Sequence, residues 1–138
     1  MPTTQRRHDG AGHHLNPSRV LVVDDYRGAA IAVATYFSLD GLDARVAGGC
    51  GDALEVVRNW LPDVVLLDIF MPQRDGFETA HAMRQYLPAS GMLIVAYTAT
   101  DKELIEKNPY NVEFDGYARK GTPPDKLVSF VKELCHSH

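Results

Sequence analysis

Cysteine is scarce in this chain of 138 residues, which contains only Cys50 and Cys135. Two cysteines are too few for a secreted disulfide scaffold, and neither belongs to a CxxC motif or to a cluster with zinc-ligand spacing. No apolar run reaches the roughly 18 residues that a membrane-spanning helix needs. The first residues also lack the apolar segment of a secretion signal. These absences favour a protein of the reducing cytoplasm that has no membrane association.

Positive charge is also limited, because 14 Lys and Arg residues stand against 18 Asp and Glu residues and the net charge is −4 at pH 7. This balance argues against a surface that binds nucleic acid directly. No G-x-G-x-x-G or Walker A loop follows the first apolar run, so nucleotide binding is unsupported. A length of 138 residues suits one domain, which can fold without a disulfide or a structural metal.

The first 18 residues differ in composition from the rest of the chain. They are polar, include three histidines and two glycines, and contribute almost nothing that could join a core. We therefore expect a flexible N-terminal tail over residues 1–18 and one folded domain over residues 19–138.

Five short apolar runs alternate with segments of helical periodicity. The runs lie at residues 20–23, 44–46, 64–67, 92–96 and, more weakly, 114–119. Apolar residues recur at helical spacing over residues 27–39, 52–61, 76–87 and 123–135. Repeated strand–helix units predict an α/β fold, in which an open, doubly wound parallel sheet carries helices on both faces.

Two helix boundaries carry recognisable signals. Thr122-Pro123-Pro124-Asp125 resembles a capping box with proline at the first helical position. A short helix is expected over residues 101–107, and Pro109 should stop it and leave residues 108–111 as a loop.

Polar residues follow the apolar runs directly, at the expected carboxyl ends of the strands. Asp24 and Asp25 follow the first run, Asp68 the third, Thr98 the fourth and Lys120 the fifth. In a sheet of order 2-1-3-4-5 the first and third strands are neighbours, so the three carboxylates would lie side by side. Such a cluster needs a cation or raised pKa values, and carboxylate oxygens suit Mg²⁺.

This set of residues has the chemistry of phosphoryl transfer. A metal ion and Lys120 would neutralise phosphoryl oxygens, while Thr98 would donate a hydrogen bond. With no Ser/His or Cys/His pair in view, the natural nucleophile is a carboxylate that forms an aspartyl phosphate. Each residue taken alone also has a plainer explanation: Asp25 fits a helix cap, Lys120 a surface lysine and Tyr117 ordinary packing.

Four stretches resemble the receiver domain of bacterial two-component response regulators. They are Val22–Asp25, Leu66–Glu78 with its D-x-x-M-P-x-x-D-G motif, Ala96–Ala99 and Gly116–Lys120. The resemblance extends over residues 19–135 and implies a flavodoxin-like five-stranded parallel sheet of order 2-1-3-4-5. It also implies a phosphoacceptor module that catalyses only its own phosphorylation and dephosphorylation, and not a turnover enzyme.

The resemblance implies a role for each matching residue of the acidic site. Asp68 would accept phosphate from a sensor histidine kinase or a histidine phosphotransfer protein. Mg²⁺ would be held by Asp24, Asp25, Asp68 and the backbone carbonyl of Phe70.

Signalling would depend on a movement that follows phosphorylation. Thr98 and Lys120 would bind the phosphoryl group, and the shift of Thr98 would let Tyr117 turn inward and change the nearby surface. If these residues are the complete protein, that surface would contact a downstream protein target, because the length leaves no room for an output domain. If they are excised from a longer protein, the output domain lies elsewhere. The protein would be a monomer or a phosphorylation-dependent dimer.

Two positions depart from the family pattern. Gly121 follows Lys120 where the family usually has proline, so we expect no cis peptide bond there. Phe70 is bulky and apolar two residues beyond Asp68, and we expect it to hinder a hydrolytic water and prolong the phosphoryl lifetime.

The alternative from another class is a small Mg²⁺-dependent phosphatase or phosphotransferase that uses an aspartyl nucleophile on a related open sheet. Such enzymes typically carry a second Asp, the general acid or base, two residues after the nucleophile, where this chain has Phe70. A substrate-binding cap domain would also need more chain.

Overall fold

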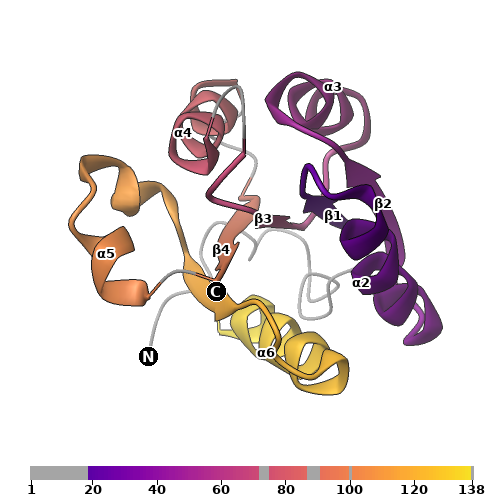
Figure 1. Ribbon diagram of the computed structural model, residues 1–138. Coiled ribbons are helices and arrows are strands. Elements are labelled where there is room, and N and C mark those ends of the chain that lie inside the picture. Colours follow the sequence, from indigo (N-terminus) through magenta and orange to yellow (C-terminus); the bar gives the residue numbers. More distant parts are fainter. Residues whose placement is uncertain (1–18, 72–74, 87–90, 100, 138) are drawn as a thin grey trace.

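Strands and helices alternate in the computed structural model, which describes residues 19–71, 75–86, 91–99 and 101–137 (Figure 1). The expected flexible tail, residues 1–18, lies outside the described residues. The strands are β1 (Arg19–Val23), β2 (Asp43–Ala47), β3 (Val64–Leu67), β4 (Leu93–Thr98) and β5 (Gly116–Arg119). The helices are α2 (Arg27–Leu39), α3 (Cys50–Trp60), α4 (Gly76–Tyr86), α5 (Lys102–Glu106), the 3₁₀ helix η2 (Pro109–Glu113) and α6 (Pro124–His136).

The strands form one parallel sheet of order β2-β1-β3-β4-β5, which confirms the predicted α/β architecture. β1 lies between β2 and β3, so the strand order reverses there. In the register of β1 and β3, Val23 pairs with Leu67, the last residue of each strand. The residues that follow these two strands therefore emerge side by side at the carboxyl edge of the sheet.

The sheet separates two apolar layers, and the residues of β3 contribute alternately to each. These residues are all fully buried and alternate between the faces. Val65 and Leu67 join the cluster covered by α3 and α4, while Val64 and Leu66 join the cluster covered by α2 and α6 (Figure 1). No helix in the described part of the chain is long and apolar enough to cross a membrane.

The segment that follows α5 differs from the predicted loop. Pro109 does not leave residues 108–111 irregular but begins η2. The backbone N–H of Asn111 donates to the carbonyl of Asn108 at 3.0 Å, and that of Phe114 donates to the carbonyl of Asn111 at 3.1 Å. Proline lacks only an N–H that is unpaired in a first helical turn, so it starts this short helix as readily as it stops another.

The predicted capping box before α6 is also wrong. Pro123 is the N-cap residue and no side chain caps the helix. The hydroxyl of Thr122 instead donates to the carbonyl of Arg119 at 2.6 Å. Proline does stand at the first helical position, as expected, because Pro124 begins α6.

Candidate functional site

Three carboxylates meet where the strand order reverses. Asp24 follows β1 and its N–H donates to the carbonyl of Ala47 at 3.1 Å, while Asp68 follows β3 and its N–H donates to the carbonyl of Val23 at 2.9 Å. Sheet hydrogen bonding thus extends to both acids and holds their backbones in place. Asp24 is 2% exposed and Asp68 5% exposed, whereas Asp25 faces solvent. One oxygen of each of the three lies within 4.8 Å of the others.

Backbone amides orient the two buried carboxylates. Oδ1 of Asp24 accepts the N–H of Tyr26 at 2.9 Å, and Oδ1 of Asp68 accepts the N–H of Phe70 at 3.3 Å. Asp25 does not cap the following helix, because Tyr26 is the N-cap residue of α2 and no side chain caps it. The interpretation of Asp25 as a helix cap is therefore wrong, and its carboxylate belongs to the acidic cluster.

Lys120 joins the two buried acids. Its Nζ lies 2.8 Å from Oδ2 of Asp24 and 3.2 Å from Oδ2 of Asp68. Its backbone N–H donates to the carbonyl of Thr98 at 2.9 Å, so the end of β4 positions the lysine. Burial lowers the pKa of Lys120, but the hydrogen bond to Asp24 and the charges of Asp68 and Asp24 outweigh it and raise the pKa overall. The side chain is therefore a firmly charged ammonium and not a solvated surface lysine.

Burial raises the pKa of Asp68, and the nearby charge of Asp24 adds to this effect. The ammonium of Lys120 opposes it but does not cancel it. One lysine thus leaves the cluster with an excess of negative charge that a further cation would offset. Hard oxygen ligands at this spacing are typical of a Mg²⁺ site, and the donor set fits that ion.

Thr98 and Tyr117 line the same cavity. Thr98 ends β4 and is buried, while Tyr117 is half-buried on β5. The cavity has a volume of about 150 Å³ and is also lined by Lys102 and Ile105. The Nζ of Lys102 lies 5.3 Å from the centre of the Tyr117 ring, and burial raises the pKa of the Tyr117 hydroxyl. The predicted switch residues therefore share one space.

The backbone at Gly121 is incompatible with the proline that usually follows this lysine in the family. Its φ is +93°, a left-handed value that proline cannot adopt, and no peptide bond within the described residues is cis. The expectation of a trans bond at this position is confirmed.

Gly76 belongs to the D-x-x-M-P-x-x-D-G motif, but its role at the site was not predicted from the sequence. A Cβ atom placed on it would lie 2.4 Å from the carbonyl oxygen of Asp68 and 2.6 Å from the Cα of Ile69. Its N–H donates to the carbonyl of Ile69 at 2.6 Å. Asp75, the preceding residue, accepts the N–H of Glu78 at 2.9 Å and caps α4. The Asp-Gly pair of the motif thus starts α4 and brings its first turn against the backbone of Asp68.

Phe70 occupies the position where an aspartyl phosphatase needs its second acid. Its side chain is 59% exposed and lies next to the acidic site in sequence. An apolar ring cannot donate or accept the proton that substrate turnover requires. Position 70 therefore does not supply the general acid that the alternative enzyme would need.

Comparison with known proteins agrees with this geometry. A family model described as response regulator receiver domain matches residues 20–132. The chain is similar to the response regulator protein TrrA of Thermotoga maritima, solved in complex with Mg²⁺-BeF, at 27% identity and a TM-score of 0.75, covering 85% of this chain and 98% of that one. The Francisella response regulator 1452 receiver domain is 28% identical, with a TM-score of 0.74 and coverage of 87% and 97%.

A third similar structure shows the fold alone. It is the CheY-like receiver domain protein from Methanospirillum hungatei JF-1, which is 24% identical with a TM-score of 0.77 and covers 86% of this chain and 93% of that one.

Proposed function

The chain belongs to the response regulator receiver domain family, a family of phosphoacceptors in two-component signalling. We propose that Asp68 is the residue that becomes phosphorylated. The observation that carries this proposal is the ammonium of Lys120, 2.8 Å from Asp24 and 3.2 Å from Asp68. A buried carboxylate that is oriented by a backbone amide and flanked by a fixed cation is equipped to receive a dianionic group.

In the proposed reaction an oxygen of Asp68 forms a bond to phosphorus while the P–N bond of a phosphohistidine breaks. The imidazole leaves with that electron pair. Lys120 pairs with a phosphoryl oxygen, and the hydroxyl of Thr98 donates a hydrogen bond to another. Asp24, Asp25, Asp68 and the backbone carbonyl of Phe70 would hold Mg²⁺. When bound, Mg²⁺ supplies positive charge that neutralises the phosphoryl oxygens.

The same proposal assigns the conformational switch to Thr98 and Tyr117. When Thr98 turns toward the phosphoryl group, the space beside it becomes open to the Tyr117 ring. The cavity of about 150 Å³ between the two residues supports this motion. Burial of the ring would change the surface formed by α5, β5 and α6, which a downstream protein reads.

Membership in the family implies a kinase partner. We further propose that a sensor histidine kinase or a histidine phosphotransfer protein in the cytoplasm supplies the phosphoryl group. The phosphorylated domain would act as a monomer or a dimer on a protein target, and its net charge of −4 argues against direct contact with nucleic acid.

Incubation with acetyl phosphate and Mg²⁺, followed by intact-mass measurement, tests the proposal. We expect a single phosphoryl adduct on the wild-type chain and none on Asp68→Asn. Asp43→Asn is a matched control, because Asp43 is an exposed aspartate at the start of β2 and should leave the adduct unchanged. An adduct that persists in Asp68→Asn, or the absence of any adduct on the wild-type chain, would refute the assignment.

A further inference from the structure

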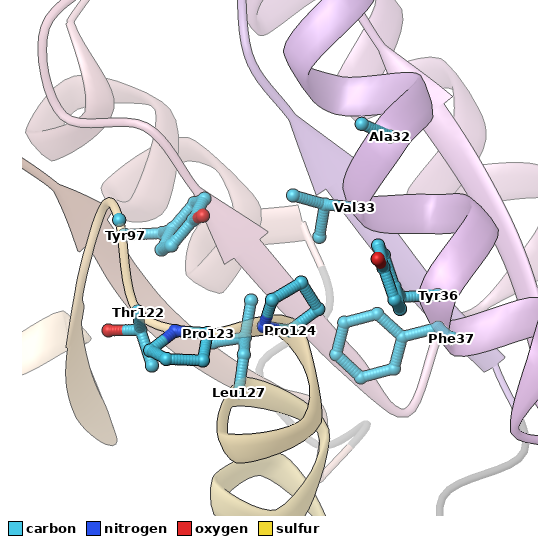
Figure 2. A pocket seen from close by; sticks show the side chains of 10 residues that line it. Ala32, Val33, Tyr36, Phe37, Tyr97, Thr122, Pro123, Pro124 and Leu127 are labelled. Atoms are coloured by element: carbon cyan, nitrogen blue, oxygen red, sulfur yellow. The ribbon is translucent and has the colours of Figure 1, made fainter.

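A second hollow lies between α2 and the start of α6 (Figure 2). It is on the other face of the sheet from the cavity that Thr98 and Tyr117 line. Its volume is about 280 Å³. The walls are Ala32, Val33 and Phe37 from α2 and the two prolines at the start of α6, Pro123 and Pro124. None of the described residues that line it carries a charge. The hollow is therefore an apolar pocket separate from the acidic site.

Tyr97 contributes a buried polar group to this pocket, whereas the hydroxyl of Thr122, which also lines it, donates to the carbonyl of Arg119. Tyr97 is 7% exposed, and its hydroxyl makes no hydrogen bond with any residue in the described part of the chain. Figure 2 shows the hydroxyl pointing into the pocket toward Val33. The exposed Tyr36 also lines the pocket, but its hydroxyl can reach water. A buried hydroxyl aimed into an apolar space without a partner is costly, and a ligand can relieve that cost.

The surroundings define what such a ligand must be. Burial raises the pKa of Tyr97, so the hydroxyl stays protonated and offers its proton to an acceptor. Lys120 lies 6.0 Å from the centre of the Tyr97 ring, but its ammonium is paired with Asp24 and Asp68. Among the described residues around the pocket, no unpaired charge is left to hold an ionic ligand. A dry cavity of about 150 Å³ accepts one benzene ring, so the volume here suits two fused rings.

We propose that this pocket binds a neutral bicyclic molecule whose carbonyl oxygen accepts a hydrogen bond from Tyr97. The pocket touches the two segments that carry Thr98 and Lys120. Tyr97 precedes Thr98 on β4, and Gly121, which lines the pocket, follows Lys120. A bound molecule would thus contact the backbone that positions the threonine and the lysine.

Two probes that differ only in the carbonyl group test this inference. Indanone has two fused rings and a carbonyl oxygen, and indane has the same rings without it. Association constants for both are measured by chemical-shift titration of the unphosphorylated chain, so the result does not depend on phosphorylation of Asp68. Tyr97→Phe removes only the buried hydroxyl, and Tyr36→Phe removes the exposed one as a matched control.

In the wild-type chain we expect both probes to shift the signals of residues that line the pocket. The ratio of indanone to indane affinity should fall roughly 3-fold to 10-fold in Tyr97→Phe, as for the loss of one neutral hydrogen bond, and stay unchanged in Tyr36→Phe. Ala32→Phe, at an exposed position, should fill the pocket and abolish binding of both probes.

Three results would overturn the proposal. One is the absence of binding of either probe up to its solubility limit. Another is an affinity ratio that Tyr97→Phe leaves unchanged. The third is probe affinity that falls as the protein concentration rises, because this would mean that a second copy of the chain covers the pocket.

Discussion

Replacing Gly76 with alanine adds one methyl group at the closest approach of a helix to the backbone of Asp68. That methyl carbon would lie 2.4 Å from the carbonyl oxygen of Asp68 and 2.6 Å from the Cα of Ile69. Both of the contacted atoms belong to the backbone, so no rotamer change can relieve the clash. Either α4 or the segment that carries the phosphoacceptor must move.

The size of the shift sets the expected cost. Two carbon atoms favour a separation of about 3.5 Å or more, so the Gly76 and Ile69 backbones must separate by about 0.9 Å. Overpacking of this kind typically costs about 1 to 3 kcal/mol. Alanine regains about 0.5 to 1 kcal/mol in a helix relative to glycine. The net expected loss for Gly76→Ala is therefore up to about 2.5 kcal/mol in the free energy of unfolding, with a midpoint of about 1 kcal/mol.

Urea unfolding followed by circular dichroism measures this loss, with Gly51→Ala as the control. Gly51 lies in α3, and a Cβ atom placed there has no atom within 4 Å. That control should be stabilised by about 0.5 to 1 kcal/mol through helix propensity alone. Phosphorylation by acetyl phosphate should slow in Gly76→Ala only, because Asp68 is displaced. Equal unfolding free energies for the two variants would refute the close-approach explanation of Gly76.

Three further predictions concern the acidic site. Asp68→Asn should raise the free energy of unfolding of the Mg²⁺-free protein at neutral pH, because burial holds the pKa of Asp68 above its ordinary value. The difference from wild type should shrink as the pH falls through that raised pKa, and urea unfolding that shows no such change would contradict this. Lys120→Met should cost about 1 to 3 kcal/mol at neutral pH, since the buried Asp24 and Asp68 lose their cation, and added Mg²⁺ should recover part of it. Phe70→Ala should shorten the phosphoryl lifetime by admitting water, and loss of the wild-type adduct within seconds, without a phosphatase, would rule out such shielding.

Much of the site could be predicted because it depends on strand ends. Apolar runs locate the strands, and a parallel sheet brings all of their carboxyl ends to one edge. With the order 2-1-3-4-5, which makes β1 and β3 neighbours, the positions of Asp24 after β1 and of Asp68 after β3 predict that the two acids lie together. Lys120 follows β5 in the same way, and its contacts with both acids agree with that expectation.

Short segments between the strands were less predictable, because their conformation depends on what packs against them. Local sequence predicts a loop around Pro109, whereas this proline begins η2. The segment packs against α4, where the guanidinium of Arg84 donates to the carbonyl of Glu113 at 2.9 Å. Such contacts join residues far apart in the chain, and no local pattern around Pro109 reveals them.

The amino-acid sequence by itself determined the sheet, the family and the chemical character of the acidic site, since these follow from apolar periodicity and from residue types in order. Only the tertiary structure decided which glycine must remain without a side chain and which buried hydroxyl lacks a partner among the described residues. Gly76 meets Ile69 across a loop, and Tyr97 faces a pocket built by α2 and α6. Both depend on distances between elements, because packing brings these surfaces together only in the folded chain.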